Sequence, residues 1–161
     1  HDSSIQTTMR SFRISAWFSV FLILVGVICT CAQSSEETEV FDLVNRERVK
    51  ARLQPLEWDD RAANVARNYS RQMAREGFFG HFDRQGLTVI ERASKLKWSK
   101  IGENLFMGEQ VPKFEAFAVK GWMRSTTHRF NILDREWNTT GIGVHHSNNG
   151  LIYVTQVFLS K

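Results

Sequence analysis

Residues 140–160 restrict the fold more than any other part of the sequence. The runs TGIGVHHS and LIYVTQVFLS flank Asn149-Gly150, a dipeptide that strongly favours a tight turn between two antiparallel strands. In the second run, Tyr153 and Val157 fall on one face of the strand, and apolar residues also occupy the other face. Apolar groups on both faces of a strand are typical of a sheet that is covered on two sides.

The sequence upstream of these strands predicts two well-delimited helices. The first opens with a serine three residues before Glu37, which is a capping-box pattern, and extends to about Arg52. Asp59 or Asp60 can cap the second helix, in which apolar residues follow helical spacing, and Gly77 ends it.

One more strand and one more helix are expected in the middle of the chain. The strand is KIGENLFMGE at 100–109 and the helix is VPKFEAFAVKGWMRS at 111–125. Phe117 and Trp122 belong to the apolar stripe of this helix. Gly121 costs helix stability, so we expect a neighbouring backbone to approach it closely. Three helices and at least three strands, the last two antiparallel, predict an α+β fold in which helices cover a sheet.

The N-terminal segment, residues 1–32, has the pattern of an extension followed by an export signal. Arg10 and Arg13 precede or border an uncharged run, Ile14 to Ala32, that ends in small residues. We expect cleavage after Ala32. Two alternatives remain open from the sequence: the run can be retained as a membrane anchor, because it is nearly long enough to span a bilayer, or a lipid can be attached at Cys31.

Residues 33–161 are expected to form one domain that is secreted or extracytoplasmic, or anchored through the N-terminal segment. The chain contains two cysteines, and both lie in the export segment, so packing alone must stabilise the domain. Its basic residues are spread along the chain, which excludes a nucleic-acid-binding patch. The domain contains no segment apolar enough to span a membrane, so we expect no membrane span once the signal is cleaved.

Three side chains distant in the sequence are candidates for a shared site: His81, Glu103 and His128. Two neutral imidazoles and one carboxylate would form a three-ligand metal site with an open position, the arrangement that hydrolytic zinc uses. The alternative is structural, with the histidines bonded to backbone carbonyls at helix ends and the glutamate bonded to loop amides.

A metal-free catalytic interpretation is also open. Ser125, His128 and Glu103 could act as nucleophile, base and orienting group. The sequence shows no strained nucleophile turn and no oxyanion donor, which disfavours this interpretation. Hydrogen bonds from Asn104, Arg129 and Asn131 to loop backbone would explain their motifs without any catalysis.

Five motifs, in order, resemble the CAP superfamily of cysteine-rich secretory, antigen 5 and pathogenesis-related-1 proteins. They are LVNRERVKARLQPLEWDDRAANVARNYSRQMAREGFFGHFD, GENL, WMRSTTHRFNIL, GIGV and YVTQVF, and they extend from about Val40 to Phe158. The sequence is most similar to the cysteine-free bacterial branch, the SCP-like extracellular proteins. This resemblance implies a three-layer α-β-α sandwich with a central, mainly antiparallel sheet and a surface cleft.

The resemblance assigns only part of the family's cleft. His81 and Glu103 match its first histidine and first glutamate. Ser125 stands where many members carry a second glutamate, and Tyr153 stands where they carry the second histidine of HYTQ. We expect His128 to supply the second imidazole from a different backbone position. The predicted cleft residues are therefore His81, Glu103, Ser125, His128 and Tyr153, and the predicted metal ligands are His81, Glu103 and His128.

These observations favour a non-catalytic binding module, and three functions stay open. The resemblance implies a cleft for a small apolar or peptide-like ligand, with a lipid, a sterol, a peptide or an envelope protein as partner. No cofactor is required, although zinc or calcium in the cleft would agree with the family. The alternatives are an extracytoplasmic hydrolase, metal-assisted or serine-based, and a structural domain of the cell envelope.

Overall fold

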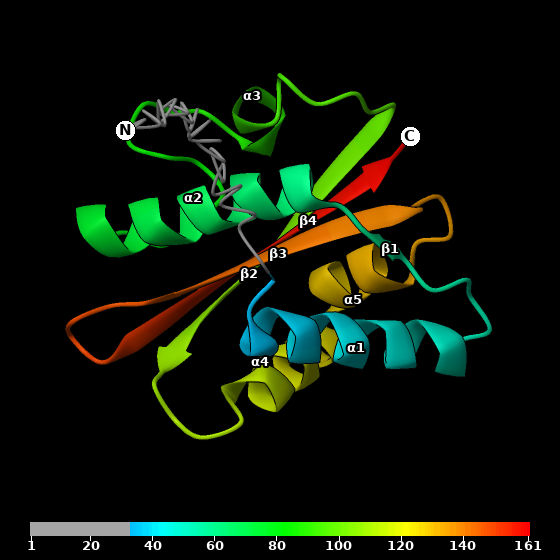
Figure 1. Cartoon of the computed structure of the whole chain (residues 1–161), viewed down its shortest axis with the longest axis horizontal. Coiled ribbons are helices and arrows are strands. Elements are labelled where there is room, and N and C mark those ends of the chain that lie inside the picture. The colour runs from blue at the N-terminus through cyan, green and yellow to red at the C-terminus, as the bar shows by residue number, and fades with distance from the viewer. Residues whose placement is uncertain (1–32) are drawn as a thin grey trace, which may run out of the picture. The chain divides into compact units, whose positions relative to one another are not determined.

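The computed structural model describes residues 33–161, so the predicted export segment at 1–32 lies outside the described residues. The described part contains five helices and four strands (Figure 1). They are α1 (Ser35–Lys50), β1 (Glu57–Trp58), α2 (Asp60–Glu76), α3 (Val89–Arg92), β2 (Lys100–Glu109), α4 (Phe114–Arg124), α5 (Thr126–Leu133), β3 (Thr139–His146) and β4 (Leu151–Ser160).

The four strands form one sheet in the order β1-β3-β4-β2. Strand β4 pairs antiparallel with both of its neighbours, so that Val157 lies opposite Glu103 of β2 and Gly141 of β3. Strand β1 is short and pairs parallel with β3. The predicted α+β fold with a mainly antiparallel sheet is confirmed. Strand β2 lies at one edge of the sheet.

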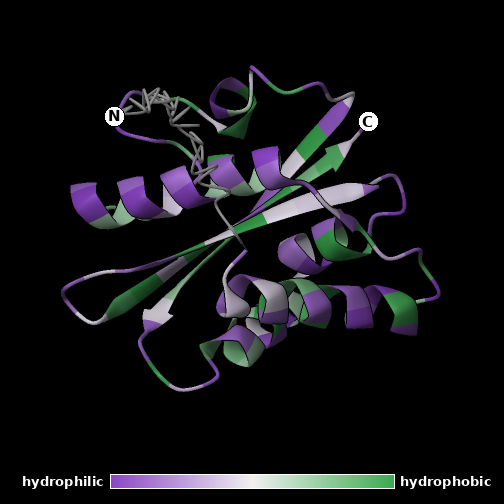
Figure 2. Cartoon of the chain, in the orientation of Figure 1, coloured by the Kyte–Doolittle hydropathy of each residue, from purple (hydrophilic) through white to green (hydrophobic). Residues whose placement is uncertain are grey.

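Helices cover both faces of this sheet. Helices α2 and α3 lie on one side, and α1, α4 and α5 lie on the other (Figure 1). In Figure 2, hydrophobic residues (green) lie in the strands and on the inner sides of the helices. Hydrophilic residues (purple) lie mainly on the outer sides of the helices. The larger core lies between the sheet and the second helical layer, which consists of α1, α4 and α5. Its buried residues are Val40, Val44, Leu56, Phe114, Val119, Trp122, Ile132, Trp137, Ile142, Ile152, Val154 and Phe158.

Helix α2 packs directly on the backbone of β3, which requires two glycines. A Cβ atom on Gly141 would lie 2.0 Å from the backbone nitrogen of Ala63, and one on Gly143 would lie 2.1 Å from that of Arg67. No side chain fits at such distances. The GIGV motif is therefore explained by helix-to-sheet contact, and it fixes α2 against the sheet.

The predicted helix ends agree with the structure. Ser34 and Glu37 form the capping box of α1. The Asp59 side chain accepts hydrogen bonds from two backbone N–H groups at the start of α2. Gly77 ends α2 in the left-handed conformation, with a φ of 65°, which a residue without a Cβ adopts at little cost.

The hairpin between β3 and β4 is confirmed, and its turn is longer than the dipeptide alone implies. The strands are joined by residues 147–150. The Ser147 N–H donates to the Leu151 carbonyl at 2.8 Å, and the Gly150 N–H donates to the Ser147 carbonyl at 3.2 Å. Gly150 takes the left-handed conformation, with a φ of 83°, and this residue lets the chain re-enter the sheet.

The third predicted helix requires correction. Helix α4 begins at Phe114, because Lys113 adopts a φ of 60° and cannot continue a helix. Phe117 is 59% exposed and is not part of the buried stripe. Apart from its chain neighbours and the backbone of its own helix, no atom of the described residues lies within 4 Å of a Cβ added to Gly121, so no neighbouring backbone approaches it. Residues 126–133, for which no separate helix was predicted, form α5.

Candidate functional site

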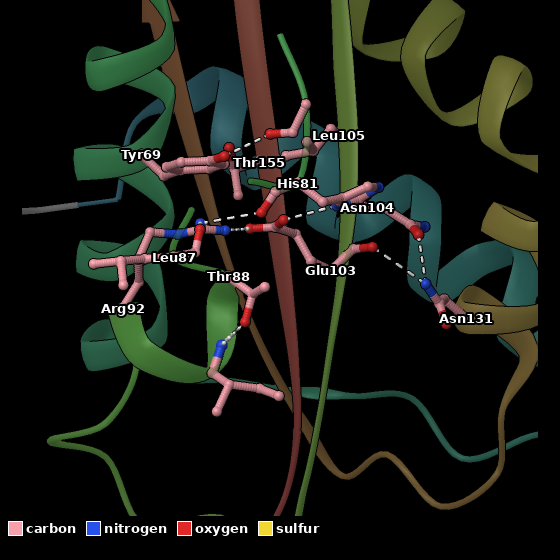
Figure 3. A network of polar contacts seen from close by, with 12 residues as sticks. Tyr69, His81, Leu87, Thr88, Arg92, Glu103, Asn104, Leu105, Asn131 and Thr155 are labelled. Carbon is pink, nitrogen blue, oxygen red and sulfur yellow. Dashed lines mark hydrogen bonds and ion pairs between the residues drawn. The ribbon is translucent and has the colours of Figure 1, made fainter. Parts of the chain in front are cut away.

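Glu103 is a buried carboxylate shared between a histidine and an arginine. Its side chain is 3% exposed. Oε1 lies 2.8 Å from Nδ1 of His81, and Oε2 lies 2.6 Å from Nη2 of Arg92. The three side chains come from the edge strand β2, from the segment after α2 and from α3 (Figure 3). Both carboxylate oxygens are thus engaged by groups of the chain itself.

The backbone around His81 is held from two sides. Gly77 ends α2 and turns the chain, after which the Gly80 carbonyl accepts a hydrogen bond of 2.5 Å from the Tyr69 hydroxyl. The carbonyl of His81 itself accepts from Arg92 Nη1 at 3.3 Å. The imidazole side chain is 51% exposed. A buried carboxylate therefore fixes one edge of a ring that solvent can reach.

Arg92 reaches Glu103 because a short capped helix points it inward. Thr88 and Glu91 form a capping box at the start of α3. The Arg92 side chain is 10% exposed, and its guanidinium carbon lies 3.3 Å from the centre of the Tyr69 ring, a cation–π contact. Its Nη1 also donates to the Leu87 carbonyl at 3.0 Å. Burial raises the pKa of Tyr69 to about 12, and the charge of Arg92 opposes this shift.

The Glu103–Arg92 pair favours a proton on Nδ1 of His81. A carboxylate that neutralises a guanidinium only accepts hydrogen bonds. His81 therefore donates from Nδ1 to Glu103, and in the neutral imidazole its Nε2 is an acceptor. Among the described residues, His81 Nε2 has no hydrogen-bond partner of its own. On this exposed ring, Nε2 can accept a hydrogen bond from an N–H or O–H group of a ligand.

Side chains from the second helical layer cover the outer edge of β2. Asn131 Nδ2 donates to the Glu103 carbonyl at 3.2 Å, and Trp122 Nε1 donates to the Leu105 carbonyl at 2.8 Å. Asn104 Nδ2 in turn donates to the His128 carbonyl at 3.1 Å. The unpaired carbonyls of an edge strand are satisfied in this way. Asn104 and Asn131 thus bond to backbone groups as predicted, although the acceptors lie on α5 and β2 and not in loops.

His128 lies on α5, in the same region of the molecule as His81. Burial lowers the pKa of His128, and the charge of His81 lowers this pKa further. The charge of His81 thus acts on the His128 imidazole. In the part of the chain that the structure describes, no hydrogen bond joins the His128 ring to Glu103 or to Ser125.

The predicted nucleophile, base and orienting group are not assembled as a triad. Glu103 orients His81 and not His128. Ser125 lies between α4 and α5, where its carbonyl accepts from the Arg129 N–H at 2.9 Å. The prediction that Tyr153 lines a cleft also needs correction. Tyr153 is 4% exposed and packs in a core cluster with other buried residues, namely Tyr69, Met73 and Leu105.

The predicted three-ligand metal site does not fit this arrangement. Within residues 33–161, no group of three or more histidine, cysteine, aspartate or glutamate side chains is placed to hold a metal ion. The donor set gives the reason, because both oxygens of Glu103 already bind His81 and Arg92. A guanidinium at 2.6 Å occupies the coordination space that a metal would need.

Arg92 and Tyr69 are the site residues that the sequence reasoning missed. Thr88 and Glu91 have the capping-box spacing, and this signal, if followed, predicts a short helix that ends at Arg92. Tyr69 lies on the buried face of α2. The pairing of Arg92 with Glu103 depends on the packing of α3 against β2, which spacing does not reveal.

Comparison with known proteins agrees with the fold. Residues 41–158 match CAP, described as the cysteine-rich secretory protein family. "Uncharacterized protein YkwD" of Bacillus subtilis (strain 168) is 35% identical over 133 residues, which cover 80% of this chain and 48% of that protein. The chain thus spans about half the length of this relative.

Solved structures show the same architecture. An extracellular protein containing a SCP domain, from Bacillus anthracis str. Ames, aligns with a TM-score of 0.68 and 29% identity, covering 78% of this chain and 40% of that one. NaASP2, solved with Zn²⁺, aligns with a TM-score of 0.60 and 15% identity, covering 78% and 80% of the two chains, which is a likeness of fold. In residues 33–161 of the present chain, no helix has the length and apolarity to cross a membrane. With the family match over most of its length and the same layered sheet, the chain belongs to the CAP family of cysteine-rich secretory proteins.

Proposed function

We propose that the chain is a non-catalytic, extracytoplasmic binding module that accepts a peptide-like ligand at His81. One observation carries the proposal: the exposed His81 ring is fixed from behind by the buried Glu103, with its Nε2 available as an acceptor. A backbone N–H is the donor that a peptide offers repeatedly. The similar Bacillus anthracis protein is extracellular, which supports a location outside the cytoplasm.

Exposed apolar side chains surround this acceptor in the sequence. Phe82, next to His81, is 65% exposed, and Phe79 is 46% exposed. Leu87 and Ile90 follow in the same connection between α2 and β2, at 42% and 51%. Large apolar side chains that gather on a surface commonly mark a binding site. An acceptor beside apolar groups matches a peptide with apolar side chains better than it matches a charged ligand.

The geometry gives less support to catalysis. An imidazole backed by a carboxylate is the geometry of a general base, so hydrolysis by an activated water is the second candidate. However, Ser125 makes no hydrogen bond to either imidazole among the described residues, so a serine nucleophile is not paired with the base. A divalent ion would also have to displace Arg92 before Glu103 could serve as its ligand.

Selection from a phage-displayed random heptapeptide library, followed by titration of an enriched peptide, tests the proposal. We expect His81→Ala and Phe82→Ser to weaken binding, and both should fold because their side chains are exposed. His146→Ala is the matched control, since this histidine is also exposed and also pairs with a carboxylate, Glu36, at 3.0 Å. Peptide binding that His81→Ala leaves unchanged, or the absence of any enrichment, would contradict the proposal.

Activity and other ligands are tested with the same variants. Turnover of a peptide or ester panel that His81→Ala abolishes would replace binding with hydrolysis as the function. Binding of sterol-containing vesicles in place of peptides would assign a lipid ligand and reject the peptide. A thermal shift with zinc or calcium would detect an ion that binds the folded chain.

A further inference from the structure

We infer that Arg92 takes the place of a metal ion in the His81–Glu103 centre. Its guanidinium compensates Glu103, so that Glu103 anchors His81 and does not coordinate a metal. Removal of the Arg92 charge would convert Glu103 and His81 into metal ligands. This inference concerns the same surface as the proposed function but does not depend on which ligand binds there, since its test uses zinc alone.

Arg92 balances the charge of Glu103 in the His81–Glu103 centre. The Glu103 side chain is 3% exposed and that of Arg92 is 10% exposed. A buried carboxylate without a nearby cation is strongly unfavourable. In a metal centre the ion supplies that positive charge, whereas here Arg92 supplies it at 2.6 Å.

The position of the Arg92 side chain is fixed by its helix and by its contacts. The capping box of α3 sets the helix that carries it. Its guanidinium then contacts the Tyr69 ring at 3.3 Å and the Leu87 carbonyl at 3.0 Å (Figure 3). Its Nε is buried and has no hydrogen-bond partner among the described residues, so the hydrogen bonds of this group are directed at Glu103 and two carbonyls.

Few coordinating atoms are left for a metal ion in this centre. Glu103 Oε1 accepts from His81 and Oε2 accepts from Arg92. A divalent ion that approached the carboxylate would meet the positive guanidinium beside it, and like charges at such separations repel. The imidazoles of His81 and His128 then remain, which is fewer protein ligands than structural or catalytic zinc sites use.

The arrangement also resembles what lies behind a metal-bound histidine. In metal sites, a carboxylate commonly accepts the N–H of a ligating imidazole and orients its other nitrogen. Glu103 orients His81 in this way, so the ring is fixed without any ion. Arg92 is therefore a positioning residue, because it acts on His81 through Glu103.

A zinc titration by calorimetry, with Arg92→Met and Arg92→Lys, tests the inference. In the wild-type chain and in Arg92→Lys, which keeps the charge, Glu103 should not contribute to zinc binding. We therefore expect Glu103→Gln to leave any zinc affinity of these two chains unchanged. We expect Arg92→Met to bind zinc at least about tenfold more tightly than the wild-type chain, because the competing charge is lost. Adding either His81→Ala or Glu103→Gln to Arg92→Met should abolish this gain.

Two outcomes would overturn the inference. One is zinc binding by the wild-type chain that Glu103→Gln removes, because Arg92 would then not keep zinc out of the His81–Glu103 centre. The other is a folded Arg92→Met chain without any gain in zinc affinity, because Arg92 would then only stabilise the fold. Arg46→Met, which breaks an exposed pair with Glu39, is the control for unspecific effects of losing an arginine.

The inference stays testable if Arg92→Met does not fold. Long-range ¹H–¹⁵N NMR spectra of the wild-type chain report which nitrogen of His81 carries the proton. We expect the Nδ1–H signal to persist when zinc is added. Its loss on zinc addition, together with sensitivity of zinc binding to Glu103→Gln, would show that the ion displaces the hydrogen bond and would reject the inference. Failure of the peptide experiment would leave all of these outcomes unchanged.

Discussion

Glu103 Oε1 lies 2.8 Å from His81 Nδ1, although the two residues are separated by 22 positions in the sequence. This contact joins the edge strand β2 to the irregular segment after α2. One residue further along β2, Asn104 faces the opposite side of the sheet and contacts α5. Two successive residues of one strand thus link both helical layers to the candidate site.

Arg92→Met is expected to destabilise the fold strongly. The pair with Glu103 is buried, and removing one partner leaves an uncompensated carboxylate, which costs about 3 to 5 kcal/mol. Urea unfolding monitored by circular dichroism measures the change. Arg46→Met breaks an exposed pair and should cost less than about 1 kcal/mol. Equal losses in the two variants would contradict the assigned role of burial.

Tyr69→Phe is expected to loosen the chain at His81 with a modest loss of stability. The substitution removes the hydrogen bond from the hydroxyl to the Gly80 carbonyl but keeps the ring that Arg92 contacts. We expect a loss of about 1 kcal/mol in the free energy of unfolding. Amide hydrogen exchange should accelerate near Gly80 more than in β4, and a uniform acceleration would argue against a local role.

His128 is expected to make stability depend on pH below neutrality. Burial lowers its pKa in the folded chain below the ordinary value of 6.5. The unfolded chain therefore binds more protons in this range, and stability falls as the pH drops from about 7 through 6.5 and below. His145 has a pKa lowered mainly by burial as well, so it contributes in the same direction.

Urea unfolding of the wild-type chain and of His128→Gln at pH 5, 6 and 7 checks this expectation. The variant should lose less stability than the wild-type chain over this interval, because the glutamine carries no proton. The contribution of His145 remains in both chains and cancels in the comparison. An unchanged or steeper dependence in His128→Gln would show that the folded chain does not disfavour the charged imidazole.

Gly143→Ala and Gly121→Ala are expected to change stability in opposite directions. A Cβ at position 143 would lie 2.1 Å from the backbone nitrogen of Arg67, so α2 must shift, and we expect a loss of about 3 kcal/mol or more. Gly121 lies in α4 with no atom near its Cβ position, so alanine there should stabilise the helix by about 0.5 to 1 kcal/mol. Thermal unfolding of the two variants distinguishes these outcomes.

Local signals predicted the elements that depend on local chemistry. Strand 100–109 and the β3–β4 hairpin follow from apolar alternation and turn residues, and the limits of α2 follow from Asp59 and Gly77. Gly121 shows where such reasoning fails. Its presence in a helix suggested a close contact, yet the helix carries it on an open surface, and the sequence does not say which face of α4 is buried.

Only part of the candidate site was predictable from the sequence. His81 and Glu103 were found from their motifs, and the structure brings them together. Their third partner is Arg92, although His128 and Ser125 were the expected companions. Which partner Glu103 meets depends on the face of β2 to which it points and on the position of β2 at the edge of the sheet. The sequence did not supply this strand order.

The turn at Ser147–Gly150 lies far from the centre along the sheet. Glu103 is paired with Val157, and the hairpin end of the sheet is reached six positions later, where Glu109 is paired with Leu151. At about 3.3 Å per residue this is a distance of roughly 20 Å. A fluorophore or an extra peptide could therefore be inserted at the turn as a reporter. The His81–Glu103 end of the sheet would be left unchanged.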